Sequence, residues 1–115
     1  CALPIYDEMI AYTSQLCHVV SNAFIKNENA VKHSGFSAGS YKDLTRVARL
    51  NPDMWTTLMS ENRDKLTKEL DALIGHLSGY REALRANDTE ELRRLLAEGN
   101  ERKISIDVKN AKKGE

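Results

Sequence analysis

The sequence contains few residues that interrupt helices or cross-link chains: two prolines, six glycines and two cysteines among 115 residues. With so few prolines and glycines, long stretches are free to form helix, and Leu, Ala, Glu, Lys and Arg favour it. Two cysteines are too few for a disulfide framework, and Cys1 and Cys17 lack the close spacing of metal ligands. We therefore expect a single all-α domain with no metal site.

Excess charge and long apolar runs are also absent. The 17 basic and 17 acidic residues cancel, so the chain carries no electrostatic footprint for nucleic acid. No apolar run approaches the roughly 20 residues that span a bilayer, and no secretory signal is visible. Cys17 lies in an apolar helical pattern and is expected to be a buried free thiol. These absences predict a cytoplasmic protein that binds neither nucleic acid nor a membrane.

Helical periodicity and capping residues divide the chain into helices. We expect these helices at residues 4–26, 41–50, 52–60, 61–86 and 89–103. A polar loop is expected at 27–34 and an irregular segment at 36–39.

Three helix starts are predicted from capping residues. Ser40 with Asp43 resembles a capping box, and Asp88 with Glu91 is expected to cap the last helix. Asn51 is expected to cap the helix that begins at the proline after it.

The longest expected helix carries an apolar seam. Its members alternate spacings of four and three, as in a coiled coil that needs a partner helix: Leu66, Leu70, Leu73, Leu77, Tyr80 and Leu84. The seam predicts a homodimer. Residues 1–103 are expected to form the domain and 104–115 a polar tail or linker, in which Ile104, Ile106 and Val108 alternate as in a strand.

The first expected helix has an unusual distribution of side chains. Polar residues occupy one third of its wheel, and apolar residues fill the rest: the polar set is Asp7, Ser14, Gln15, His18, Ser21 and Asn22. One interpretation is a central helix whose thin polar side meets solvent. The other is a cleft lined by Ser14, Gln15 and His18, which combines uncharged hydrogen-bonding groups with one imidazole.

A candidate anion site begins at Gly39. Glycine lets a ligand approach the backbone closely, and the start of the following helix presents unpaired N–H groups. Lys42 and Arg46 lie four residues apart and therefore on one face of that helix. Such a site suits a carboxylate or a phosphate. The alternative is that Lys42 and Asp43 are ordinary surface charges and that Arg46 pairs with an acid. For Trp55, the only tryptophan, the alternative to a site is the core or a dimer interface.

Three segments together resemble prephenate dehydrogenases. The family patterns are Ser-His-Leu-Pro-His, a Gly-rich loop before Phe-x-Asp-x-Thr-Arg-Ile-Ala, and Asp-Pro-x-Met-Trp. The corresponding segments here are residues 14–18, 38–48 and 51–55, in the same order and with similar spacing. Gln15 and Cys17 replace a histidine and a proline, Tyr6 stands where a histidine is common, and Ser40 stands where glycine is frequent.

The resemblance implies a helical dimerisation domain like the C-terminal domains of 6-phosphogluconate-dehydrogenase-type enzymes. The implied reaction is NAD- or NADP-dependent oxidative decarboxylation of prephenate to 4-hydroxyphenylpyruvate in tyrosine biosynthesis. Arg46 would bind a prephenate carboxylate, and Gly39 would offer a backbone contact. His18 with Ser14 would line the substrate and nicotinamide pocket, and Trp55 would reach the site from the partner subunit.

The resemblance also implies that the catalytic histidine and the dinucleotide fingerprint belong to a preceding domain. No Gly-x-Gly-x-x-Gly pattern occurs in these 115 residues. We therefore expect no catalytic residue in this chain and no activity from it alone. Two other functions remain open at this point: arogenate dehydrogenase, and a helical interaction module without chemistry.

Overall fold

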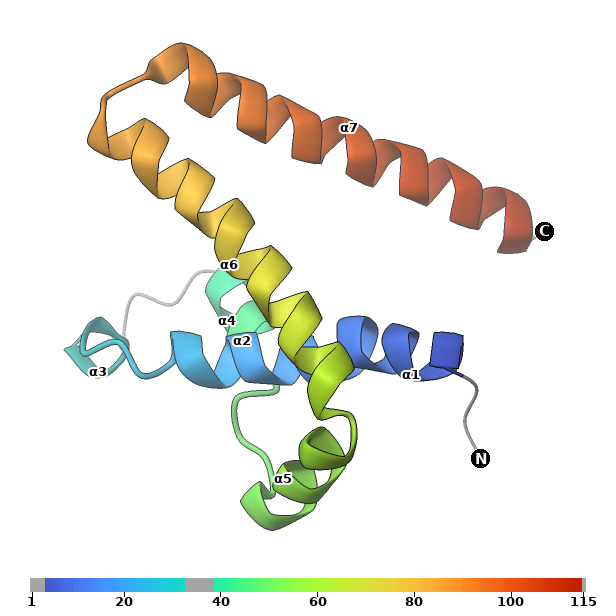
Figure 1. Cartoon of the computed structure of the whole chain (residues 1–115). Helices are drawn as coiled ribbons and strands as arrows, with labels where there is room; N and C mark the ends of the chain where they lie inside the picture. Colours follow the sequence, from blue (N-terminus) through green and yellow to red (C-terminus); the bar gives the residue numbers. More distant parts are fainter. Residues whose placement is uncertain (1–3, 33–38, 115) are drawn as a thin grey trace. The chain divides into compact units, whose positions relative to one another are not determined.

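A computed structural model gives the fold, and it describes residues 4–32 and 39–114 (Figure 1). All regular elements in these two ranges are helical, which confirms the all-α class. They are α1 (Pro4–Ile10), the π-helix η1 (Ala11–Gln15), α2 (Leu16–Phe24), α3 (Asn29–Lys32), α4 (Gly39–Thr45), α5 (Pro52–Glu61), α6 (Arg63–Arg85) and α7 (Thr89–Gly114). The chain forms two compact units, Cys1–Asp71 and Ala72–Glu115, which meet within α6.

The first predicted helix is one continuous rod made of α1, η1 and α2 (Figure 1). Ile10 and Leu16, which flank the π-helix, both keep right-handed helical dihedrals, so the rod does not break. The π-helix widens one turn because its hydrogen bonds run from residue i to i+5. This widening shifts the residues after it around the helix axis, and the regular wheel used for the sequence did not include that shift.

The segment after the rod differs from the prediction. Within the expected loop, Asn29–Lys32 forms the short helix α3. Helix α4 begins at Gly39, so Ser40 lies inside it and is not its cap. The Asp43 side chain is one methylene shorter than the glutamate of a true capping box, which weakens the predicted signal. Residues 36–38 of the expected irregular segment lie outside the described residues.

Helix α4 also ends earlier than predicted, at Thr45 instead of residue 50. The Ala48 N–H donates to the Thr45 carbonyl at 3.0 Å, a tighter turn than the α-helical one. The predicted start of α5 is confirmed. The Asn51 side-chain oxygen accepts from the N–H groups of Asp53 and Met54 at 3.0 and 3.2 Å, and Pro52 is the first helical residue.

The second unit contains the turn between α6 and α7, where the chain reverses (Figure 1). Asn87 has φ 53°, and Asp88 caps α7 by accepting from the Glu91 N–H at 3.1 Å. The Tyr80 hydroxyl donates to the Leu95 carbonyl at 3.3 Å and thereby joins the two helices. The two helices therefore run antiparallel, joined by a short connection.

The conformation predicted for the C-terminal segment, residues 104–114, was wrong. Residues 104–114 continue α7, so Ile104, Ile106 and Val108 lie on a helix and do not alternate as in a strand. The ion pair between Lys103 and Asp107, at 2.8 Å, has the i,i+4 spacing that supports a helix. Local helix propensity in this charged segment outweighs the three alternating apolar residues.

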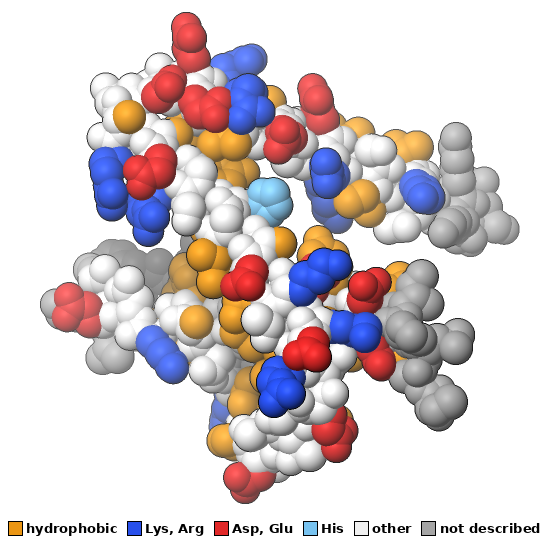
Figure 2. Space-filling model, in the orientation of Figure 1, with side chains coloured by type: hydrophobic (Ala, Val, Ile, Leu, Met, Phe, Trp, Pro, Cys, Tyr) orange, Lys and Arg blue, Asp and Glu red, His pale blue; other side chains and the backbone are white. Residues whose placement is uncertain are grey.

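Few described residues are buried, and the first helix exposes large apolar side chains. Met9 and Tyr12 are 59% and 60% exposed, while the polar residues Gln15 and Ser21 are 4% and 0% exposed. The other four residues of the polar stripe are partly exposed, so the stripe meets solvent only in part. Cys17 is exposed, so the expectation of a buried thiol was wrong for a single chain. Figure 2 shows other hydrophobic side chains among charged ones at the surface.

Candidate functional site

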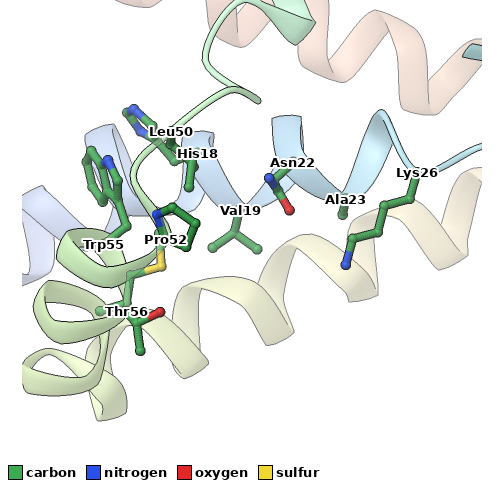
Figure 3. Close-up of a pocket in the computed structure, with 10 residues that line it drawn as sticks. His18, Val19, Asn22, Ala23, Lys26, Leu50, Pro52, Trp55 and Thr56 are labelled. Carbon is green, nitrogen blue, oxygen red and sulfur yellow. The ribbon is translucent and has the colours of Figure 1, made fainter.

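A groove of about 380 Å³ lies between α2 and α5 (Figure 3). We call it the α2–α5 groove. Its lining residues are His18, Val19, Asn22, Ala23, Lys26, Leu50, Pro52, Trp55, Thr56 and Met59. The first five come from α2 and the turn after it, and the last four lie on α5 at the spacing of one helix face. The volume lies within the usual range for small-molecule sites.

His18 and Trp55 form one end of the groove. Their rings stack with centroids 4.0 Å apart and an interplanar angle of 26°. Both side chains are half-buried. Two residues from separate sequence motifs therefore meet within one chain. The expectation that Trp55 reaches the site from a partner subunit does not describe this contact, because the Asn51 cap and Pro52 direct α5 back onto α2 of the same chain.

The His18 ring has a defined orientation. Its Nδ1 lies 2.8 Å from the Ser14 backbone oxygen, and a carbonyl oxygen can only accept, so Nδ1 carries the hydrogen. In the neutral ring, Nε2 is then the acceptor. Ser14 thus contributes its backbone oxygen to the site, and its side chain does not line the groove. Nε2 of His18 can therefore accept a hydrogen bond from a donor group such as a ligand hydroxyl.

Gln15 does not line the groove, although the sequence placed it in the same cleft as His18. Its Nε2 donates to the Leu58 carbonyl at 3.3 Å, and its Oε1 accepts from Asn62 at 2.9 Å. Asn62 also donates to the backbone oxygen of Asp7 at 2.9 Å. The buried Gln15 amide therefore ties the first helix to the end of α5, and both of its polar atoms are engaged in that packing.

The predicted anion residues Gly39, Lys42 and Arg46 are exposed and do not line the α2–α5 groove. Arg46 follows the last residue of α4, seven residues after Gly39, so helical rise separates it from the free N–H groups by about 10 Å. Its positive charge therefore lies at the opposite end of this short helix from those groups. No described acid forms an ion pair with Arg46.

Sequence reasoning missed three groove residues that carry polar groups: Asn22 as a lining residue, Lys26 and Thr56. The Asn22 amide donates to the Ala48 carbonyl at 3.0 Å, which leaves its Oδ1 as an acceptor. His18, Asn22 and Lys26 are spaced by four residues, so the wheel already contained this signal. Nothing in the sequence placed Thr56, because that required knowing which face of α5 meets α2.

No group of three or more His, Cys, Asp or Glu side chains within 4–32 and 39–114 is arranged to hold a metal ion. In the same ranges, no helix combines the length and hydropathy needed to cross a bilayer.

The described residues form an all-helical fold with a groove of ligand size between α2 and α5. Residues 5–98 match the family model of the prephenate dehydrogenase dimerization domain. Since this match covers most of the chain, the chain belongs to that family.

Curated relatives agree with the family match. A cyclohexadienyl dehydrogenase of Zymomonas mobilis is 30% identical over 107 residues, which cover 88% of this chain and 36% of the relative. A prephenate dehydrogenase of Bacillus subtilis is 26% identical over 96 residues, which cover 79% of this chain and 26% of the relative. The chain thus spans about a third or less of the length of these relatives.

Solved structures share the fold. The arogenate dehydrogenase of Synechocystis superposes with a TM-score of 0.80 at 25% identity, over 92% of this chain and 41% of that one. The prephenate dehydrogenase of A. aeolicus, in complex with hydroxyphenyl propionate and NAD+, gives 0.75 at 25% identity, over 89% of this chain and 37% of that one. The resemblance inferred from the motifs is therefore confirmed at the level of the family and the fold.

Proposed function

We propose that this chain is the dimer-forming and substrate-side domain of a dehydrogenase that converts prephenate to 4-hydroxyphenylpyruvate on the route to tyrosine. The observation that carries the proposal is the His18–Trp55 stack. It brings together two of the three sequence motifs, 37 residues apart, at one end of a groove of ligand size. A helical module without ligands has no need of such a groove, so we favour the enzyme over that alternative.

The reaction requires two departures from the substrate ring. A hydride leaves the carbon that bears the hydroxyl, and carbon dioxide leaves as the electrons of its carbon–carbon bond enter the ring, which becomes aromatic. The hydroxyl keeps its proton in the phenol product, so a base that accepts a hydrogen bond from it during hydride transfer returns the proton. The products balance as 4-hydroxyphenylpyruvate, carbon dioxide and reduced dinucleotide. In this scheme His18 accepts a hydrogen bond from the substrate through Nε2, because Nδ1–H is bound to Ser14. The Trp55 ring holds His18 in that orientation and excludes water from one side of it.

NAD or NADP supplies the hydride acceptor when bound. The described residues do not fit the whole cofactor, because they contain neither a strand nor the glycine-rich turn that holds a pyrophosphate. We therefore assign dinucleotide binding, and the catalytic histidine, to another domain of the parent enzyme. His18 is the residue of this chain that we expect to lie nearest the nicotinamide.

Arogenate is the second candidate substrate. It differs from prephenate in carrying an amino group in place of the side-chain keto group. It is favoured by one similar structure, the arogenate dehydrogenase of Synechocystis. Both substrates carry two carboxylates, so the same cations serve either one.

The test is the formation of NADH or NADPH by the purified parent enzyme with prephenate and with arogenate. We expect turnover with at least one of them, and no turnover from the 115-residue chain alone. Reduction of neither dinucleotide with either substrate would refute the proposed function. Turnover by the chain alone would refute the assignment of the cofactor to another domain.

Arg46 is the residue that we propose for one substrate carboxylate in the assembled enzyme. A hydrogen bond to a charged group contributes roughly 1.5–3 kcal/mol, so Arg46→Ala should raise KM by about ten- to a hundredfold. Arg46→Lys should recover part of that loss, because lysine keeps the charge but lacks the planar fork. An unchanged KM with a lowered melting temperature would instead assign Arg46 a structural role.

A further inference from the structure

Lys26 gives the α2–α5 groove a positive charge that the sequence motifs do not include. It is the single Lys or Arg among the ten described lining residues, and no Asp or Glu is among them. No described carboxylate forms an ion pair with it. Figure 3 shows its side chain extending from the end of α2 back toward the middle of the groove. The groove is therefore cationic, and its own walls do not neutralise it.

The remaining polar groups of the groove favour a small polar ligand. Asn22 keeps its Oδ1 free, since its amide N–H is bound to Ala48. Thr56 has no side-chain hydrogen bond among the described residues, although the neighbouring Thr57 bonds its own helix at 3.1 Å. His18 presents Nε2 at the other end of the groove. These groups together can donate to and accept from a ligand that also satisfies the lysine.

The stacked rings and the lysine lie at opposite ends of the groove (Figure 3). Its His18 end carries the stacked rings, with Leu50, Pro52 and Met59 also in the lining. Lys26 follows His18 by eight residues, which corresponds to a rise of about 12 Å along a helix. The flexible Lys26 side chain points back along the groove, so its ammonium group lies closer to His18 than this rise. A molecule with a flat ring at one end and a carboxylate at the other matches this order.

We propose that the α2–α5 groove binds a small ring-bearing carboxylate, with Lys26 as the counter-ion of the carboxylate and the His18–Trp55 end in contact with the ring. The inference rests on the proposed function and deepens it. The proposed substrates carry two carboxylates, and Arg46, which lies outside this groove, is assigned only one of them. Lys26 holds the other and so determines which end of the substrate points toward His18.

The test uses the 115-residue chain, in which Trp55 is the only tryptophan and therefore reports on the groove by its fluorescence. The probes are 3-(4-hydroxyphenyl)propionate and its uncharged primary amide. We expect the carboxylate to quench Trp55 and to bind about five- to tenfold more tightly than the amide, because only the carboxylate forms a charge-assisted hydrogen bond with lysine.

Lys26→Met should remove the preference for the carboxylate while leaving the affinity for the amide unchanged, and Lys26→Arg should keep the preference. The matched control is Lys68→Met on α6, an exposed lysine outside the groove, which should behave as the unsubstituted chain. Circular dichroism verifies that each variant keeps its helix content.

Several results would overturn the inference. These are equal affinity for the two probes, a preference that survives Lys26→Met, an equal loss in Lys68→Met, or no quenching at millimolar probe. Loss of the preference in Arg46→Met alone would reassign the carboxylate to Arg46. Failure of the proposed function is a separate result, because it is judged by dinucleotide reduction in the parent enzyme and not by binding to this chain.

Discussion

At the residue scale, Ser21 is a buried polar group without a partner. Its side chain is 0% exposed, and its hydroxyl oxygen has no hydrogen bond within the described part of the chain. An unsatisfied buried polar group costs roughly 1–3 kcal/mol. Ser21→Ala removes that group and fits the same space, so we expect the free energy of unfolding to rise by about 1 kcal/mol, measured by urea denaturation. A decrease of similar size would show that the hydroxyl has a partner in solution.

The exposed pair of Glu91 and Arg94 on α7 makes a pH-dependent contribution to the stability of the fold. Both guanidinium contacts of Arg94, at 2.5 and 2.9 Å, reach the Glu91 carboxylate. These hydrogen bonds lower the pKa of Glu91 and raise that of Arg94. Because the folded-state pKa of Glu91 is depressed, its stabilisation is present above the ordinary pKa of glutamate and is lost as the pH falls through the lowered value.

Removing the guanidinium should therefore return the pKa of Glu91 toward its usual range. The measurement is an NMR titration of the Glu91 carboxyl carbon in Arg94→Ala. Arg93→Ala is the control, since Arg93 is also exposed and makes no described ion pair with Glu91. A pKa that moves in the control as much as in Arg94→Ala would point to the general charge of α7 and not to this contact.

At the scale of helices, Gly99 tests how closely α6 and α7 approach. A Cβ at this position would lie 3.8 Å from the Tyr80 hydroxyl oxygen, an ordinary van der Waals distance. Glycine inside a helix is less stable than alanine by roughly 0.8–1 kcal/mol. Gly99→Ala should therefore raise the free energy of unfolding by about that amount. A lower stability would show that the two helices pack more closely in solution than this distance allows.

Local signals in the sequence were sufficient to predict most of the helices. The caps at Asn51 and Asp88 are interactions within four residues, so residue type and spacing predict them directly. The length of α7 was missed for the opposite reason, because three alternating apolar residues were given more weight than the helix propensity around them. The π-helix has no periodic signal of its own and was not predictable from the pattern.

The site was predictable only where the motifs themselves meet. His18 and Trp55 were both predicted and do lie together. Gln15 was assigned to the cleft because it is near His18 in sequence, but its burial against Asn62 depends on where α6 begins. The spacing of four residues placed Lys26 on the same helix face as His18 and Asn22. It was still missed as a groove residue because the groove exists only where α5 packs against α2, a tertiary contact that a helical wheel does not contain.

At the scale of the whole molecule, the amount of exposed apolar surface is the main unexplained feature. Large hydrophobic side chains are exposed on the first helix, on α5, on α6 and on α7, while only a few are buried. Exposed large apolar side chains such as those of the first helix are typical of a surface that a second chain covers. This agrees with the membership of the chain in a dimerization-domain family. We therefore expect a symmetric homodimer in which Met9 and Tyr12 lie in the interface.

Sedimentation equilibrium at micromolar concentration should give a mass of about twice the 13.0 kDa of one chain. Tyr12→Glu should dissociate the dimer, because a carboxylate would replace an aromatic ring in the core of an interface that commonly buries upwards of about 2,000 Å². The matched control is Asn100→Glu, which adds the same charge at an exposed polar position of α7. A monomer for the unsubstituted chain would refute the dimer. Equal dissociation of both variants would attribute the effect to net charge and not to the exposed apolar residues of the first helix.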